Sequence, residues 1–261
     1  MAFQALSRAL TCICGATSPD SSPITGVNDI PMDAVTANHI TNQYESCARC
    51  SSKSSSIANP RTIFIIGAPG AGKGTQSEFL VERFGLTHLS YGDLMRRLRN
   101  SRDKVVSRMP TKKGTNNPEV PDDLSAWLIW REIRDDDTKT WLLDGFPRRV
   151  EQVDEWLQLI PPADLTLYLK CPPKVSAERV AKRGKLAGAK ARPEDLDPSI
   201  ARRRIEEFYK NADLVVGKLA ERGMRVEEVN TNRSREVIQA DLERIMVSIQ
   251  TVPERLCHAS G

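Results

Sequence analysis

The chain has 261 residues, 39% of them hydrophobic, and a formal net charge of +4. This apolar content is enough for the buried core of one large or two small domains. Because acidic and basic residues nearly balance, we expect no nucleic-acid partner, and no window is apolar for long enough to cross a bilayer. Six cysteines, irregularly spaced in a chain of this length, argue against a disulfide scaffold.

The N-terminal segment, residues 1–58, is rich in Ser, Thr, Asn and Gly, and we expect it to be a mostly disordered extension. It contains four of the cysteines: Cys12, Cys14, Cys47 and Cys50. Free thiols are favoured for them, with a zinc site as the alternative. The first nineteen residues contain one base, Arg8, and only a weak apolar stripe. A cytoplasmic location is therefore favoured, with a chloroplast or mitochondrion as the alternative.

From residue 59 onward, short apolar runs alternate with helical patterns, and residues 251–261 are expected to be a C-terminal tail. The expected strands are residues 62–66, 87–89, 141–143, 165–169 and 225–229. The clearest expected helices are residues 76–84, 122–134 and 235–249. Strands and helices that alternate in this way predict a doubly wound α/β sheet with right-handed crossovers.

A glycine-rich loop follows the first expected strand, with the sequence Gly67-Ala68-Pro69-Gly70-Ala71-Gly72-Lys73-Gly74-Thr75. Glycines let a backbone wrap closely, so that successive amide groups point at phosphate oxygens. A helix that starts near Lys73 adds its positive end, and the lysine ammonium reaches the outer phosphates. Gly74 stands where Ser or Thr usually follows this lysine, and Thr75 comes one position later. The loop predicts a P-loop for a nucleoside triphosphate.

The third expected strand ends in Asp144, which we interpret as an acid that holds magnesium through water, or alternatively as the cap of a turn. No Glu stands beside Asp144 to activate water for hydrolysis, and two arginines, Arg148 and Arg149, follow instead. They favour an anionic substrate. Phosphoryl transfer demands no general base, and we place the three histidines outside the charged motifs: His39, His88 and His258.

Three segments in this order resemble the adenylate kinase family, which includes the UMP/CMP kinases: the glycine-rich loop, Ser90-Tyr91-Gly92-Asp93-Leu94-Met95-Arg96, and Asp144-Gly145-Phe146-Pro147-Arg148. The resemblance covers about residues 61–250. It implies a P-loop NTPase fold with a five-stranded parallel sheet and helices on both faces. It also implies a phosphotransferase that takes ATP with Mg²⁺, has small-molecule nucleotides as its partners and acts as a monomer.

By this resemblance, residues 59–250 form a nucleoside monophosphate kinase domain with two inserts. Residues 90–120 would be the monophosphate-binding segment, and residues 179–204 would be a short lid. The lid has no cysteine, so we expect no structural metal there. Arg179 and Arg183 are four residues apart on one expected helix, so they share a face and can converge on one ligand.

The resemblance also implies roles for individual residues. The catalytic set would be Lys73, Arg148, Arg183 and Arg204. The ATP-binding set would be Gly70, Ala71, Gly72, Lys73, Gly74, Thr75, Arg179, Arg183 and Arg233. The monophosphate-binding set would be Tyr91, Arg96, Val120, Gly145, Arg148, Gln152, Arg192 and Arg204. The magnesium acid would be Asp144.

Several positions bear on which base the acceptor carries, and they favour different bases. Gln152 matches the adenine-binding glutamine of adenylate kinases, whose amide can pair with the edge of adenine, although some UMP kinases also have it. Asn117 replaces an expected glycine, and Cys171-Pro172 is typical of UMP/CMP kinases. Tyr91 matches neither group, and its ring would stack on the base, block the pocket or point to solvent. AMP is favoured; the alternatives are a UMP/CMP kinase and a catalytically weak nucleotide sensor.

Overall fold

The computed structural model describes residues 60–250 apart from residues 102, 104–105, 114–117, 135, 137–138 and 189–190. The expected extension lies outside the described residues, with its four cysteines and His39. The expected C-terminal tail with His258, and Asn117, also lie outside them. Within the described ranges, no helix has the length and apolar character that a membrane crossing requires.

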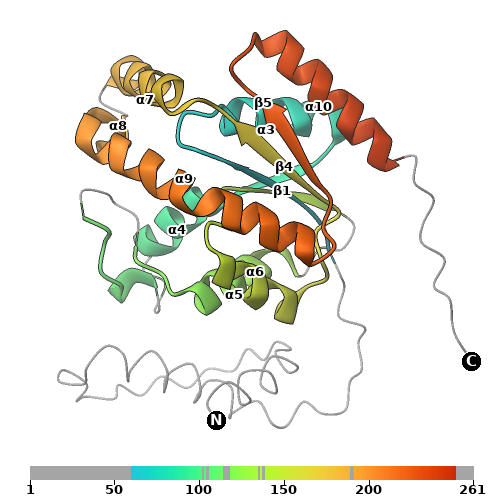
Figure 1. Cartoon of the computed structure of the whole chain (residues 1–261). Coiled ribbons are helices and arrows are strands. Elements are labelled where there is room, and N and C mark those ends of the chain that lie inside the picture. The colour runs from blue at the N-terminus through green and yellow to red at the C-terminus, as the bar shows by residue number, and fades with distance from the viewer. Residues whose placement is uncertain are drawn as a thin grey trace, which may run out of the picture. The chain divides into compact units, whose positions relative to one another are not determined.

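The described chain alternates strands and helices along its whole length (Figure 1). In the first half the order is β1 (Arg61–Gly67), α3 (Lys73–Phe84), β2 (Thr87–Ser90), α4 (Tyr91–Asn100), the 3₁₀ helix η1 (Val106–Arg108), α5 (Asp122–Ile133) and β3 (Thr140–Asp144). In the second half it is α6 (Val150–Leu159), β4 (Leu165–Lys170), α7 (Pro173–Ala187), α8 (Pro193–Leu196), α9 (Pro198–Glu221), β5 (Val226–Asn230) and α10 (Arg235–Gln250).

The strands form one parallel sheet in the order β2-β3-β1-β4-β5. β1 is the central strand, and the residues from Thr62 to Gly67 are all buried, as its unbroken apolar run predicts for a strand covered on both faces. All five expected strands are confirmed to within one or two residues. In a parallel sheet the loops after the strands meet at one edge, so the P-loop after β1 and Asp144 at the end of β3 become neighbours.

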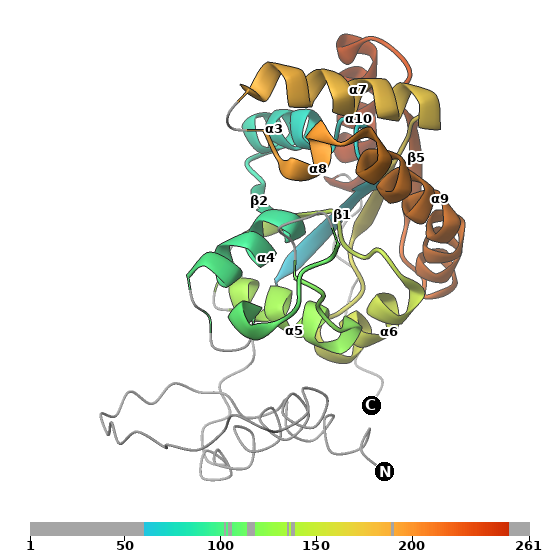
Figure 2. The ribbon, with the colours of Figure 1, turned by 90° about the vertical axis from the view of Figure 1, so that its left-hand side faces the viewer.

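Helices cover both faces of the sheet (Figures 1 and 2). On one face, Leu80 of α3 and Leu242 of α10 pack in a buried cluster with strand residues such as Ile63 and Ile65. On the other face, α6 contributes Trp156, whose ring lies 5.4 Å from that of Phe64. The neighbouring residues of β1 therefore point to opposite layers, which is the period-two alternation of a strand.

The end of one expected helix, and the start of a helix that was not predicted, both have local causes. α3 ends at Gly85, whose φ of 67° is left-handed and whose amide donates to the Val81 carbonyl, so glycine is favoured there. α4 begins after Ser90, whose hydroxyl accepts from the amide of Asp93. This cap places α4 directly after β2, at the same edge of the sheet as the P-loop.

The contact between α7 and α8 depends on a glycine. A Cβ added to Gly184 of α7 would lie 2.6 Å from the backbone oxygen of Asp195 in α8. Gly217 in α9 is a matched case, since a Cβ there would meet nothing within 4 Å. We therefore expect the same substitution to have opposite effects at the two positions.

Gly217→Ala should raise the free energy of unfolding by about 0.5–1 kcal/mol, because alanine loses less backbone entropy in a helix. Gly184→Ala should lower it by about 1–3 kcal/mol, because the added methyl group overpacks against backbone that cannot rotate away. Urea denaturation of both variants measures the difference. A Gly184→Ala protein as stable as Gly217→Ala would show that α8 is not packed as described.

Candidate active site

The P-loop after β1 folds back on itself at two glycines. Gly70 and Gly72 have φ values of 85° and 95°, which favour glycine, and the amide of Ala71 donates to the Ala68 carbonyl. A Cβ on Gly70 would lie 2.3 Å from the backbone oxygen of Ser176, so α7 leaves no room for a side chain there. The loop then leads into the N-terminus of α3, where free amides and the helix dipole favour an anion.

Lys73 is the first residue of α3, and its ammonium lies inside the curve of the P-loop. Nζ donates to the carbonyl oxygens of Gly67 at 2.8 Å and Ala68 at 3.2 Å. Burial lowers the pKa of Lys73 to about 8; Asp144 raises it, and nearby arginines lower it further. The lysine thus occupies a site where a positive charge is costly until an anion binds.

Three arginines that are far apart in the sequence act electrostatically on this lysine: Arg148, Arg204 and Arg183. Burial also lowers the pKa of Arg204, and the charges of Arg148 and Arg183 contribute to this, while Glu194 and Asp195 oppose it. Within the described part of the chain, Nη1 of Arg204 is buried without a hydrogen-bond partner. The predicted catalytic set is therefore gathered at one place, and one of its donors, Nη1 of Arg204, has no protein acceptor in the described ranges. A polyphosphate would supply the missing negative charge.

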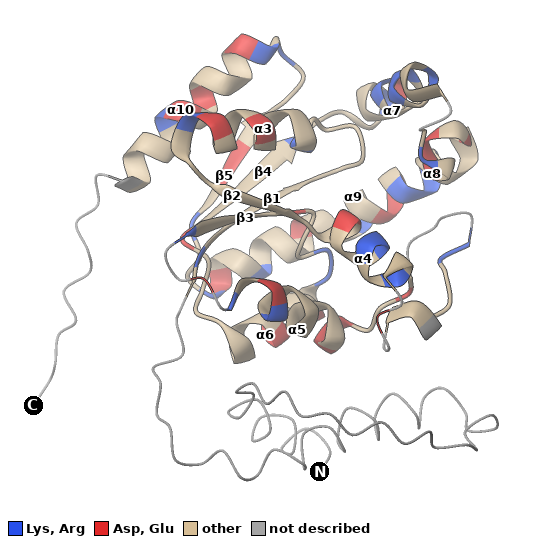
Figure 3. Ribbon diagram, turned by 180° about the vertical axis from the view of Figure 1, so that it is seen from behind, with Lys and Arg blue, Asp and Glu red and all other residues tan. Residues whose placement is uncertain are grey.

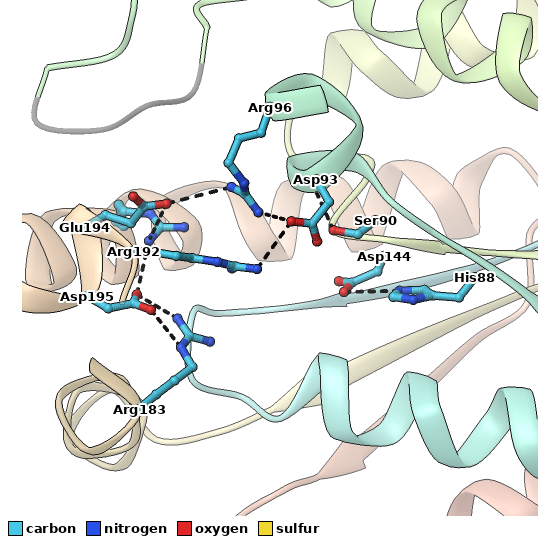
Figure 4. A network of polar contacts seen from close by, with 10 residues as sticks. His88, Ser90, Asp93, Arg96, Asp144, Arg183, Arg192, Glu194 and Asp195 are labelled. Carbon is cyan, nitrogen blue, oxygen red and sulfur yellow. Dashed lines mark hydrogen bonds and ion pairs between the residues drawn. The ribbon is translucent and has the colours of Figure 1, made fainter. Parts of the chain in front are cut away.

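Asp144 lies at the end of β3 and has an unexpected neighbour. Nε2 of His88, on β2, is 3.5 Å from Oδ2 of Asp144 (Figure 4). The expectation that His88 lies outside the charged motifs is therefore wrong. β2 and β3 are parallel neighbours, so side chains near their ends meet at the same edge of the sheet.

The surroundings of Asp144 fit a magnesium ion that arrives with a nucleotide. In the described ranges, no group of three or more His, Cys, Asp or Glu side chains could hold a metal by itself. Magnesium is usually bound by one or two carboxylates, several waters and substrate phosphates, and it does not need a complete protein cage. A single strand-end carboxylate beside a P-loop is the donor set that this coordination uses.

The acids of α8 hold arginines of the expected lid and of α4. Asp195 accepts from both Nε and Nη2 of Arg183, at 2.8 and 2.7 Å. Glu194, which is 2% exposed, lies 3.9 Å from Nη1 of Arg204 and 3.9 Å from Nη1 of Arg96. These two buried carboxylates fix guanidinium groups from α7, α9 and α4 relative to one another (Figure 4).

A second contact joins the expected lid to the expected monophosphate segment. Asp93 of α4 forms an ion pair with Arg96 one turn further along, and Arg192, just before α8, lies 3.5 Å from the same carboxylate (Figure 4). Figure 3 shows that α4, α7 and α9 are rich in basic residues. Asp93 therefore holds two predicted monophosphate ligands side by side.

Three of the residues predicted to bind the acceptor contact Arg148: Gly145, Gln152 and Tyr91. Nε of Arg148 donates to the carbonyl of Gly145 at 2.7 Å, and its backbone amide donates to Oε1 of Gln152 at 2.8 Å. Gln152 is buried, and its amide carbonyl is therefore oriented by the backbone. Tyr91 lies under the Arg148 guanidinium and is 8% exposed, so its ring does not point to solvent. Val120 is buried just before α5.

Two predicted ATP ligands lie at a different part of the edge. Arg179 donates to the carbonyl of Thr231, after β5, at 2.9 Å, and Arg233 donates to the carbonyl of Asn230 at 3.1 Å. Arg233 also forms an ion pair with Asp241. Gly74 and Thr75 are exposed on the first turn of α3. No contact joins Arg179 or Arg233 to Lys73 among the described residues, so their roles stay predictions.

Three side chains that support the site were not predicted from the sequence: His88, Asp93 and Ser125. The position of His88 on a strand next to β3 could have indicated the contact with Asp144. Asp93 follows the helix cap by three residues, and its spacing from Arg96 predicts an ion pair along one helix face. Ser125 gave no signal, because its contact with Tyr91 joins residues 34 apart in the sequence.

The chain matches the family model described as adenylate kinase over residues 65–224. It is 35% identical to adenylate kinase isoenzyme 1 of Bos taurus and 34% identical to that of Homo sapiens, each over 68% of this chain and 90% of the relative. It is 31% identical to UMP-CMP kinase of Sus scrofa over 67% of this chain and 91% of the relative. With the P-loop, the strand-end acid and the gathered arginines, these matches show that the chain belongs to the adenylate kinase family.

Proposed function

We propose that the protein is a nucleoside monophosphate kinase that transfers the γ-phosphoryl group of ATP to AMP. The observation that supports this best is the convergence of Lys73, Arg148, Arg183 and Arg204 beside a P-loop. A protein that only binds a nucleotide does not need cations from four separate elements around the outer phosphates. An enzyme that moves a phosphoryl group needs them on every side of that group.

The chemistry follows from this arrangement of charges. Phosphoryl transfer passes through a loose transition state in which negative charge spreads over the transferring group. The main requirements are in-line placement of the two nucleotides and fixed positive charge around the group that moves. Lys73 would act from the donor side and Arg148 from the acceptor side. Arg183 and Arg204, held by the acids of α8, would act from the lid.

Magnesium, when bound through water by Asp144, would neutralise charge on the phosphates of ATP and orient them. The lid has a separate task. Its contacts with α4 through Asp93 and Glu194 would bring the arginines over the phosphates and exclude water. Water must be excluded because an open site would hydrolyse ATP instead of phosphorylating the acceptor.

AMP is the proposed acceptor because of the way Gln152 is held. Its Oε1 accepts the amide of Arg148, so its NH₂ group is directed away from that amide and is available to donate. Oε1 retains a second lone pair. Adenine presents an acceptor nitrogen next to an amino donor, and the amide can pair with both.

Lys73→Ala should lower turnover by roughly a thousandfold and leave the fold intact, because the charge that stabilises the transferring phosphates is lost. The measurement is kcat with ATP, magnesium and AMP, together with a thermal melt. Lys210→Ala is a matched control, since Lys210 is exposed on α9. A Lys73→Ala protein that kept a third of the wild-type turnover would contradict the assignment.

The affinity for ATP should depend on pH through Lys73, whose pKa is lowered to about 8. Below pH 8 the lysine is charged in the free protein and binds the phosphates directly. Above pH 8 the free protein holds it neutral, and ATP binding must take up a proton. The dissociation constant of ATP should therefore increase by up to about tenfold per pH unit above pH 8.

Calorimetric titration between pH 7 and 9.5 measures this dependence. The Lys73→Ala protein should bind ATP more weakly and lose the pH dependence that the wild type shows. An equal dependence in both proteins would mean that another group titrates.

The acceptor is tested by turnover with ATP, magnesium and each of AMP, UMP and CMP. We expect kcat/KM to be highest for AMP. A preference for UMP or CMP would make the protein a UMP/CMP kinase, the alternative that the similarity to the Sus scrofa enzyme favours. Binding of nucleotides without turnover would indicate a sensor instead.

Gln152→Glu tests how the base is recognised. Glutamate keeps an acceptor for the amide of Arg148 but removes the NH₂ donor, so a ring nitrogen of the base is left without its hydrogen bond. We expect KM for AMP to increase about tenfold or more, while KM for ATP stays the same. An unchanged KM for AMP would show that Gln152 does not contact the base.

A further inference from the structure

Tyr91 packs against other residues of the site, and this placement differs from the two roles considered above, stacking on a base and blocking the pocket. It is the first residue of α4, and its ring is buried against Phe146, with the ring centroids 5.8 Å apart. Cζ of Arg148 lies over the Tyr91 ring, 4.9 Å from its centroid. This is the geometry of a cation–π contact.

The hydroxyl of Tyr91 is fixed by a directed chain of hydrogen bonds. It lies 2.8 Å from Oγ of Ser125, which is fully buried in α5. Ser125 has one hydroxyl proton, and it donates this to the carbonyl of Pro121 at 2.8 Å. Ser125 can therefore only accept from Tyr91, so the tyrosine is the donor. Burial raises the pKa of Tyr91, which keeps the proton in place.

Arg148 is held against an aromatic ring, whereas the other arginines of the site are held by acids. Arg183, Arg96 and Arg204 each have a carboxylate within 4.0 Å. In the described ranges Arg148 has no acidic partner; Nε donates to the Gly145 carbonyl, and the guanidinium otherwise lies on Tyr91. An acid would hold the arginine but neutralise it. An aromatic ring holds it and leaves its full charge for an anion.

We propose that Tyr91 is a positioning residue for Arg148: its ring, held by Ser125, fixes the guanidinium where the phosphate of the acceptor binds. The inference rests on the proposed function, because it takes Arg148 as an acceptor-phosphate ligand. A long side chain that is already ordered loses less entropy when it binds. The ring should therefore affect the acceptor and leave ATP binding unchanged.

The test is a fluorination series at position 91. Tyr91 is replaced by phenylalanine and by its mono-, di- and trifluorinated analogues, which have almost the same shape but a progressively weaker negative ring face. kcat/KM is measured for whichever of AMP, UMP and CMP the wild type uses best. It should fall with each fluorine, by about two- to fivefold over the series, mainly through KM of the acceptor. KM for ATP should not change.

The matched control is the same series at Phe64, a buried ring that packs against Phe146 and Trp156. Fluorination there should leave kcat/KM for the acceptor constant. A flat series at position 91, or an equal decline in both series, would overturn the inference, because a ring that only fills space does not respond to its electron density.

Two further variants test the hydroxyl chain. Tyr91→Phe and Ser125→Ala each break the same hydrogen bond, so each should raise KM of the acceptor about twofold to fivefold. The double variant should be no worse than either single one, because the interaction is shared. If the losses of the two single variants multiply in the double variant, Tyr91 and Ser125 do not act through one shared hydrogen bond, and this part of the inference is overturned.

An inactive wild type would overturn the proposed function and this inference with it. An active wild type with a flat series would overturn this inference alone.

Discussion

The site is organised around positive charges that are buried near one another. Lys73, Arg148, Arg183 and Arg204 come from four segments. Burial lowers the pKa of Lys73 and Arg204, and the charges of neighbouring arginines lower it further. Such a group is unfavourable while its charges face one another, and becomes favourable when a polyphosphate lies among them. Stability therefore has to come from the rest of the fold. The sheet with its two buried faces is what holds these cations together.

Three different devices keep the arginines in place without cancelling their charges completely. Asp195 binds Arg183 through two hydrogen bonds, and Glu194 is shared between Arg96 and Arg204 at longer distances. Arg148 has a ring and a carbonyl in place of an acid. The arginines of the proposed lid are thus held by carboxylates, which can be exchanged for phosphate. Arg148, the proposed ligand of the acceptor phosphate, is held by neutral groups, which do not compete with phosphate for its charge.

Ion pairs join the segment around α8 to α4, the two regions that we expect to be the lid and the monophosphate-binding insert. Asp93 of α4 lies between Arg96 and Arg192, and Glu194 of α8 approaches Arg96 from the other side. Both acids face groups that would also bind the acceptor. A nucleotide that enters the site would therefore exchange partners with the two acids, and movement of the lid would follow the occupancy of the site.

The sequence alone determined the layers of the fold and the identity of most charged groups. The unbroken apolar run of β1, the glycine after α3 and the P-loop with Lys73 are local patterns, because backbone burial, left-handed φ values and amide geometry act over a few residues. The tertiary structure alone decided which side chains meet across long separations. The contact of His88 with Asp144, and that of Tyr91 with Ser125 and Arg148, depend on strand register and on helix packing. No short-range pattern encodes such contacts, because side chains from different elements become neighbours only when the sheet and its helices have assembled.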